Sequence, residues 1–371
     1  MVEEQAFWIA WTQINGIGSI LIKRLQQHFG TLAAAWIASK EQLLQVEGLG
    51  LQTIDEIVLQ KSRLNPETLL QQHKAQNPNF WTPNQTDIYP RLLLETASPP
   101  PILYYKGKVA IAENQATIPL VGIVGTRSAS EYGKRWARNI SVALAKSGFT
   151  VVSGMAEGID TEAHLGCLEA GGRTIAVLGT GVDIVYPPRN RELYQQILSQ
   201  GLVVSEYSAK TPPDRPHFPQ RNRIIAGMSR AVIVIEAPVR SGALITARFA
   251  NDFCRDVYVL PGSLDNARSH GCLELISNGA TVILGIDRLL EMLGAMPQLD
   301  VSPLPQQLEL LPKDLAPELK QVWEAITFES VTFDAIVQRA NQPAGEVSGA
   351  LLQLELMGLV TQLPGMRYQK A

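Results

Sequence analysis

The stretch FPQRNRIIAGMSRAVIVIEAPVRSGALITA, from Phe218 to Ala247, decides the fold of the chain. It begins with a helical turn, continues into the apolar run Ala231–Glu236 that predicts a buried strand, and ends in a helix start at Ser241-Gly242. Two loop-to-helix junctions beside one strand place backbone N–H donors and guanidinium groups at the same edge of a sheet. This arrangement suits phosphate groups.

The same stretch lies in a basic part of a mildly acidic chain. Between Glu206 and Arg248, seven Lys or Arg residues stand against three acidic residues, a local charge of +4, whereas the whole chain of 371 residues carries −3. A local excess of this kind predicts one polyanion-binding face. The seven basic residues are Lys210, Arg215, Arg221, Arg223, Arg230, Arg240 and Arg248.

Outward from this stretch, apolar runs alternate with helical patterns, which predicts a parallel sheet covered on both faces. The predicted strands are Leu120–Val124, Thr150–Val152, Thr174–Leu178, Leu202–Ser205, Ala231–Glu236 and Val257–Leu260. The predicted helices between them include Tyr132–Lys146, Thr161–Ala170, Arg189–Gln200 and Ser241–Asp252. The run Ile102–Tyr105 follows three prolines and predicts an edge strand. Residues 86–294 are therefore expected to form a Rossmann-like α/β domain.

Ligands of such sheets bind at the carboxyl ends of the strands, and here nearly every strand-end loop carries glycine beside a small hydroxyl or charged residue. The chain has neither GxxxxGK[ST] nor a GxGxxG that opens a helix after the first strand. ATP hydrolysis and ordinary NAD binding therefore lose their main support in the sequence.

The flanking regions predict two smaller domains. Residues 1–65 contain two similar turns, Ile14–Gly18 and Val46–Gly50, typical of the helix-hairpin-helix pairs of SAM-like domains. Lys23 and Arg24 suit a phosphate contact there, but docking within the protein is the favoured role. The polar segment Ser62–Thr86 is interpreted as a connector.

After a Pro-rich linker at 295–311, residues 312–371 predict three helices and a β-hairpin, a winged-helix domain. Its presumed recognition helix, Ala344–Met357, carries Glu346 and Glu355 and no Lys or Arg, so contact with a protein is favoured over DNA reading.

Composition excludes several other classes. No run of about eighteen apolar residues predicts a membrane span, and the acidic N-terminus lacks the basic region of a signal peptide, so a cytoplasmic location is expected. The three cysteines are isolated and are expected to be buried free thiols. No histidine pair has metal-ligand spacing, so neither a metal nor a cofactor is predicted.

From Tyr89 to Ala280 the chain resembles the DNA-processing protein A family (DprA, also called Smf). The resemblance rests on a continuous series of motifs: YPRLL, ILYYKG, VGIVGTRSASEYG, VVSGMAEGIDTEAHLG, GGRTIAVLGTGVDIVYPPRN, SEYS, FPQRNRIIAGMS, VIEAPVRSGALITA, VYVLPG and GCLELISNGA. It implies a dimeric, cytoplasmic, non-catalytic protein that binds single-stranded DNA, protects incoming strands during natural transformation and loads the RecA recombinase on them. The flanking SAM-like and winged-helix domains also occur in that family.

Carried over to this sequence, the resemblance places a DNA-binding pocket at Gly125, Thr126, Arg127, Arg189 or Asn190, Phe218, Arg221, Asn222, Arg223, Ser241 and Gly242. Arginine holds phosphate through paired donors, and an aromatic ring such as Phe218 can either stack on a base or hold its loop against the core. Arg127 and Arg221 are expected to bind phosphate without supporting the core. One departure is Leu273, which stands where the family usually has Asn, so a carboxamide contact there is in doubt.

Other readings of single residues stay open beside this one. His164 is expected to bond a neighbouring loop and not to act as a base, and Asp160 and Asp183 are expected to cap helix or turn starts. The segment after Glu236 also loosely resembles the PGGxGTxxE region of nucleoside-monophosphate phosphoribohydrolases, but Thr246 stands where their glutamate would be. A purely structural adaptor leaves the basic stretch unexplained.

Overall fold

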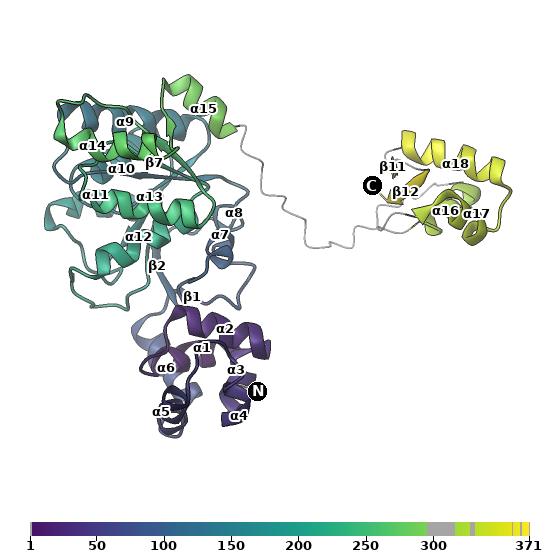
Figure 1. Ribbon diagram of the computed structural model, residues 1–371, viewed down its shortest axis with the longest axis horizontal. Helices are drawn as coiled ribbons and strands as arrows, with labels where there is room; N and C mark the ends of the chain where they lie inside the picture. Colours follow the sequence, from purple (N-terminus) through teal and green to yellow (C-terminus); the bar gives the residue numbers. More distant parts are fainter. Residues whose placement is uncertain (1, 295–315, 327–330, 358, 364–365, 371) are drawn as a thin grey trace. The chain divides into compact units, whose positions relative to one another are not determined.

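The computed structural model describes residues 2–294, 316–326, 331–357, 359–363 and 366–370. The chain divides into two compact units, Met1–Val301 and Ser302–Ala371. In Figure 1 the first unit has a helical lower part, built from the N-terminal helices, and an α/β upper part.

A twisted sheet forms the centre of the first unit. Its strands within the described residues run in the order β1-β2-β6-β5-β4-β3-β7-β8-β9. The strands from β6 to β9 are parallel neighbours, whereas β2 pairs antiparallel with β6 and β1 antiparallel with β2. Their bounds are β1 Phe80–Trp81, β2 Leu103–Gly107, β3 Leu120–Val124, β4 Thr150–Ser153, β5 Thr174–Leu178, β6 Leu202–Ser205, β7 Ala231–Val234, β8 Asp256–Val259 and β9 Thr281–Val282.

All six predicted parallel strands are confirmed, with ends that shift by at most two residues. They were recognisable because both faces of each strand are covered. Val121 and Ile123 of β3 point into one core layer, and their neighbours Leu120 and Val124 point into the other. The strand predicted at 102–105 is present as β2. Its predicted place at the edge of the sheet is wrong, because β1 lies outside β2 and forms the edge.

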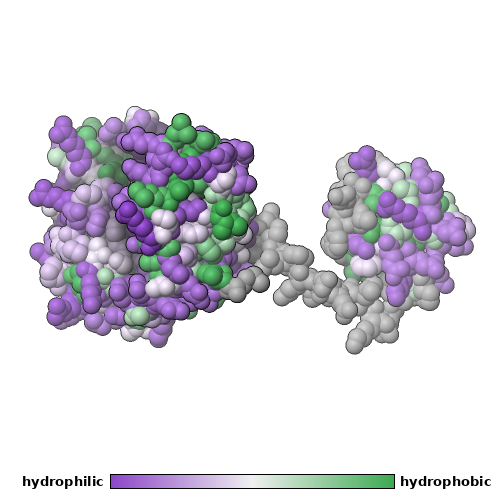
Figure 2. All heavy atoms as spheres, turned by 90° about the horizontal axis from the view of Figure 1, so that it is seen from below, coloured by the Kyte–Doolittle hydropathy of each residue, from purple (hydrophilic) through white to green (hydrophobic). Residues whose placement is uncertain are grey.

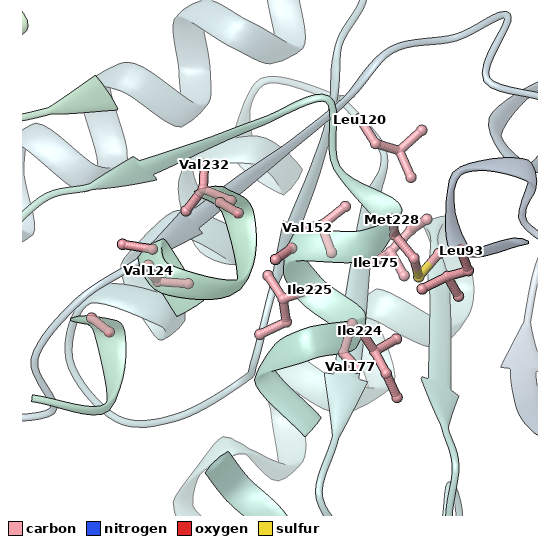
Figure 3. Packing of buried hydrophobic residues seen from close by; sticks show 14 of the residues in the cluster. Leu93, Leu120, Val124, Val152, Ile175, Val177, Ile224, Ile225, Met228 and Val232 are labelled. Carbon is pink, nitrogen blue, oxygen red and sulfur yellow. The ribbon is translucent and has the colours of Figure 1, made fainter. Parts of the chain in front are cut away.

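Helices cover both faces of this sheet. The layer that contains α7, α12, α13 and α14 buries one core, and α9, α10 and α15 bury the other. Figure 3 shows Ile224, Ile225 and Met228 of α12 packed beside the sheet. The helix bounds are α7 Arg91–Glu95, α8 Ile111–Asn114, α9 Glu131–Lys146, α10 Ile159–Glu169, η1 Pro188–Asn190, α11 Arg191–Gln200, α12 His217–Met228, α13 Gly242–Asp252, η2 Ala267–Ser269, α14 His270–Ser277 and α15 Ile286–Gly294.

The helical part has a core of its own around the buried Trp8 and Trp11. Its helices are α1 Glu4–Thr12, α2 Ser19–Phe29, α3 Leu32–Ile37, α4 Lys40–Leu43, α5 Leu51–Lys61 and α6 Pro66–Gln76. The two predicted turns join α1 to α2 and α4 to α5, and each has a glycine with positive φ, Gly16 at 82° and Gly48 at 92°. Figure 2, which views the molecule from below, shows apolar residues in patches among hydrophilic ones.

The interpretation of Ser62–Thr86 as a connector is wrong, because α6 and β1 lie in it. Helix α6 was missed because it buries only Leu70 and so lacks an apolar stripe, although Asn65 caps it and Pro66 occupies its first turn. It packs against α1, and with β1 and β2 these helices enclose a small core.

Lys23 joins the helical part to the α/β part. Its ammonium group donates to the carbonyl oxygens of Leu94, at 3.1 Å, and Thr96, at 2.5 Å. The Arg24 guanidinium donates to the Glu47 carbonyl at 2.9 Å and also pairs with its carboxylate. Both cations are therefore engaged within the protein, and the contact made by Lys23 supports the docking role.

The second unit contains α16 Pro317–Glu324, α17 Phe333–Ala340 and α18 Ala344–Leu356, with strands β10 Val331–Thr332, β11 Val360–Leu363 and β12 Arg367–Lys370. Strand β12 pairs with both other strands of this described sheet. The predicted winged-helix fold is confirmed, with β10 as an additional strand. The predicted linker at 295–311 lies outside the described residues, as do the first four residues of the predicted domain.

The described cysteines carry no disulfide, but the expectation that all are buried is wrong. Cys167 and Cys272 are buried, whereas Cys254 is exposed just beyond the end of α13. Within the described ranges, no His, Cys, Asp and Glu side chains gather in a group of three or more that could hold a metal ion. No helix there has both the length and the apolar character needed to cross a membrane.

Candidate nucleic-acid interface

The candidate site lies where the direction of chain progression through the sheet reverses. From β3 the chain moves through β4, β5 and β6 on one side and then returns to β7 on the other. Ligands of open α/β sheets bind at such a switch point, outside the carboxyl ends of the strands. A cleft of about 560 Å³ occupies this position, and we call it the switch-point cleft. Loops after β3 and β7 and the starts of α12 and α13 line it.

The loop after β3 is held in a fixed shape. A Cβ on Gly125 would lie 2.5 Å from Ile159, so only glycine fits between the loop and α10. The Thr126 amide donates to the carbonyl of Glu236 at 2.7 Å, and the Thr126 carbonyl accepts from the Ile159 amide at 3.3 Å. These contacts present the next residue, Arg127, at the open edge of the sheet.

Arg127 is exposed and lines the switch-point cleft. Its guanidinium carbon lies 5.2 Å from the centre of the Phe218 ring, a cation–π contact. Within the described part of the chain, it makes no hydrogen bond and no ion pair. Its donors are therefore available to a phosphate group, and the predicted phosphate contact stays a prediction.

Phe218 is half-buried and has aromatic and cationic neighbours. The Tyr186 ring centre lies 5.4 Å from that of Phe218, tilted by 34°, and Arg127 lies over the same Phe218 ring. Tyr186, which the sequence analysis did not select, is the more exposed aromatic ring and also lines the cleft. The three side chains form a layered group that can receive a base or a sugar.

Arg221 lies beneath the cleft and is only 3% exposed. Its guanidinium donates to the carbonyl of Gly154 at 2.7 Å and to that of Val177 at the end of β5. Burial lowers its pKa to about 10; the charge of Arg127 contributes to this shift, and Asp160 opposes it. The expectation that Arg221 leaves the core unsupported is wrong, because it links the ends of β4 and β5 from below while one side lines the cleft.

The start of α13 forms another wall of the cleft. Ser241 is its N-cap, and its hydroxyl accepts from the Ala243 amide at 3.2 Å. The Asn222 side-chain amide donates to the carbonyl of Gly242 at 3.0 Å, which fixes α12 against this helix start. The start of α13, where the helix dipole is positive, thus lines a cleft that also contains arginine.

Three of the predicted residues do not line the switch-point cleft. Asn190 is buried, and its amide donates at 2.9 Å to Met155 and Thr161, so it holds a loop. The Arg223 guanidinium pairs with Glu206 and donates to the carbonyl of Ser98.

Arg189, the third, is exposed and pairs with Glu157 at 3.0 Å, outside the residues that line the cleft. The physical reason for these differences is that each polar group finds a partner far away in the sequence.

Two arginines of the cleft were counted in the basic stretch but not selected as site residues. Arg215 and Arg240 are exposed, line the cleft, and make no hydrogen bond or ion pair within the described ranges. The local excess of positive charge was the signal that could have found them. With Arg127 they give the cleft three cations that are open to an anion.

Glu236 holds the loops around the cleft together. Its carboxylate, 1% exposed, accepts from the amide and the hydroxyl of Ser130 and from the side chain of Asn266, at 2.8, 2.7 and 3.1 Å. It therefore connects the loop that follows β7 to those after β3 and β8. Gly133 leaves room for it, since a Cβ there would lie 2.6 Å from this carboxylate.

The remaining polar residues also serve the structure. His164 is fully buried and bonds the hydroxyl of Thr174 at 2.7 Å, and burial lowers its pKa to about 3. Asp160 and Asp183 accept from loop amides at Gly154, Ala156 and Lys210, so they hold loops and do not cap their own helix or turn starts.

Comparisons with known proteins identify the family of this chain. Residues 79–294 match the family model of the DNA recombination-mediator protein A, and residues 306–366 match that of the DprA winged helix domain. The chain is 51% identical to protein Smf of Synechocystis sp. over 394 aligned residues, covering 99% of each protein. It is 35% identical to protein Smf of Escherichia coli, covering 90% of this chain and 89% of that one.

Solved structures give the same result. DNA processing protein A from Streptococcus pneumoniae matches with a TM-score of 0.67 and 32% identity, over 77% of this chain and 97% of that one. The Helicobacter pylori protein, whose structure was described for its single-stranded DNA binding mode, matches with a TM-score of 0.51 and 32% identity, over 55% of this chain and 92% of that one. The chain therefore belongs to the DprA/Smf family of DNA-processing proteins.

Proposed function

We propose that this protein binds single-stranded DNA in the switch-point cleft and does not turn over nucleotides. The observation that carries the proposal is the set of exposed arginines Arg127, Arg215 and Arg240 around one cleft, none engaged in an ion pair within the described residues. Tyr186 adds an aromatic ring, and the start of α13 adds the positive end of a helix dipole. Charge neutralisation with stacking is the usual basis of binding a single strand without reading its sequence.

Membership of the family supports a proposal for the wider role. We propose that the protein acts in the cytoplasm as a homodimer, protects incoming strands during natural transformation, and loads the RecA recombinase on them. The α/β domain, within 86–294, binds the strand in this scheme. The helical domain, within 1–65, docks on it, and the winged-helix domain, within 312–371, contacts a protein partner because α18 presents Glu346 and Glu355.

The proposal is tested by measuring the affinity for single-stranded and duplex DNA of the same length across a salt series. We expect the single strand to bind more tightly, without strong sequence preference. The logarithm of its affinity should fall linearly with that of the salt concentration, with a slope of about −0.7 for each phosphate neutralised. Binding that does not respond to salt would contradict the proposal.

An enzyme related to nucleoside-monophosphate phosphoribohydrolases is the alternative. Thr246, which lines the cleft and is 1% exposed, stands at the position where the glutamate of those enzymes would be. The carboxylate of Glu236 is already occupied by Ser130 and Asn266. Release of free base from a nucleotide incubated with the protein would support the enzyme and count against the binding protein.

A further inference from the structure

A second groove adjoins the switch-point cleft on the far side of the α13 start. It has a volume of about 590 Å³ and runs between α13 and α14. Arg240, Ser241 and Gly242 line both cavities, so the two meet at the helix start. We call it the α13–α14 groove.

The wall contributed by α13 is one face of that helix. Leu244, Arg248 and Asn251 follow Ser241 at intervals of three or four residues, the spacing of one helical face. The opposite wall, from α14, contributes Leu275 and Asn278 and their neighbours. Leucines from both helices thus give the groove an apolar surface, with amides beside it.

The charge of the groove favours an anion. Arg240 and Arg248 are exposed and make no hydrogen bond or ion pair in the described part of the chain, and Glu274 is the one acidic residue of the lining. Phosphate groups suit the two guanidinium groups, while apolar side chains and amides suit the faces and edges of bases. The groove therefore offers both kinds of contact that a nucleic-acid strand needs.

We infer that the α13–α14 groove is a second subsite for the same DNA strand. This inference rests on the proposed function of the switch-point cleft. The strand crosses the helix start at Ser241-Gly242, where Arg240 lies between the two cavities, and a later phosphate of the strand contacts Arg248. The continuity of the two cavities and the unpaired arginine favour this occupant over a protein segment. The DNA-binding site is then longer than the switch-point cleft, and Arg248 binds the strand in its far half.

The test compares Arg248→Ala with the full-length parent on oligothymidylates from about 4 to about 16 nucleotides, the range over which single-strand-binding domains engage DNA. In the parent, affinity should rise when an oligonucleotide becomes long enough to fill both cavities. Arg248→Ala should bind short oligonucleotides as the parent does. Its affinity for the longest oligonucleotides should fall by roughly tenfold, the effect of losing one charge-assisted contact. The salt slope on the longest should also fall by about 0.7.

The matched control is Arg288→Ala, which removes an exposed arginine of α15 that pairs with Glu291 and lines neither cavity. It should leave binding at every length unchanged. An Arg248→Ala protein that binds long oligonucleotides like the parent, or loses short and long ones equally, overturns the second subsite and leaves the proposed function intact. A parent that binds no single strand overturns both. A change in the molar mass of Arg248→Ala in solution, with binding unaltered, would instead make the groove an interface between two copies of the chain.

Discussion

At the scale of single residues, Arg127 gives the sharpest test of the switch-point cleft. Replacement by Ala removes a charge-assisted contact worth about 1.5–3 kcal/mol. Single-strand affinity should therefore fall by roughly ten- to a hundredfold. Because Arg127 is exposed and its only described contact is the cation–π contact with Phe218, the melting temperature should stay nearly unchanged. Fluorescence anisotropy and a thermal melt on the same sample check both statements.

The control for that experiment is Arg127→Lys, which keeps the charge but loses the planar pair of donors and should recover only part of the affinity. A folded Arg127→Ala protein with parental affinity would place the binding site elsewhere in the molecule, and the helical part would be searched next.

Arg221 should respond in the opposite way. Replacement by Met keeps an apolar stem but leaves the carbonyls of Gly154 and Val177 without a buried donor, which costs about 2–4 kcal/mol. The expected fall in melting temperature is roughly 5–10 °C, measured by calorimetry. If this variant melts like the parent, then the contacts beneath the cleft do not stabilise the fold and Arg221 acts on the ligand alone.

His164 predicts a pH dependence of stability. Its pKa is about 3 in the folded protein because it is buried, against an ordinary value near 6.5, so below that value the unfolded chain takes up a proton that the folded protein does not. Stability should therefore fall as pH drops from about 6.5 toward 3, by up to about 1.4 kcal/mol per pH unit from this residue. Above pH 6.5 this residue should not contribute to the change of stability with pH.

Urea unfolding at several pH values measures that slope. The variant His164→Asn keeps a donor for Thr174 but does not titrate, so its stability should change less with pH than that of the parent. Equal slopes for the two proteins would show that His164 is not held neutral. Asp160, whose pKa burial raises, is present in both and cancels in the comparison.

At the scale of secondary-structure elements, the sequence predicted best what neighbouring residues determine. The six parallel strands are continuous apolar runs because each is covered on both faces, and their ends were found within two residues. Helix α6 was not predicted because Leu70 is its one buried residue, so it has no apolar stripe. Strand β1 was not predicted because two residues are too few to show an alternating pattern. Short elements are held by tertiary contacts that local sequence does not record.

In the candidate site, too, the sequence located residues set by the local chain but not those set by distant partners. Gly125, Thr126 and Arg127 line the switch-point cleft, and a strand end is a local signal that fixes where the next residues lie. Arg223 was misplaced because its partners, Ser98 and Glu206, lie far from it in the sequence. Whether an arginine is free or paired depends on such distant partners, and composition cannot show it.

The docking of the helical part on α7 can be tested through Lys23. Replacement by Ala removes two hydrogen bonds from an ammonium group, which should weaken the docking by about 1–2 kcal/mol. Hydrogen exchange in α2 and α7 should then become faster. Single-strand affinity should stay within roughly twofold of the parent, since this cation is engaged within the protein and no counterion release is lost. A tenfold loss of affinity would instead favour DNA contact by the hairpins.

At the scale of the whole molecule, the winged-helix unit should be dispensable for binding a single strand. Its presumed recognition helix, α18, carries Glu346 and Glu355 and no basic residue, so deletion of this helix removes no contact with a DNA phosphate. Truncation after Pro312 should leave single-strand affinity within roughly threefold, as measured on the same oligonucleotides. A hundredfold loss would show that this unit binds DNA directly, and a loss of partner binding alone would agree with a protein-contact role.

The antiparallel pairing of β2 with β6 has a consequence for synthesis of the chain. The helical core around Trp8 and Trp11 uses residues that leave the ribosome early, whereas β2, at Leu103–Gly107, must wait for β6, at Leu202–Ser205. At about 5–20 residues per second, translation of the intervening stretch takes roughly 5–20 s. During that interval Trp81 and Leu103 lack Leu202 and Val204 of β6, with which they share a core, so the nascent chain exposes an apolar pair of strands without its next strand. Chaperones that bind nascent chains should therefore engage this protein before residue 205 has emerged.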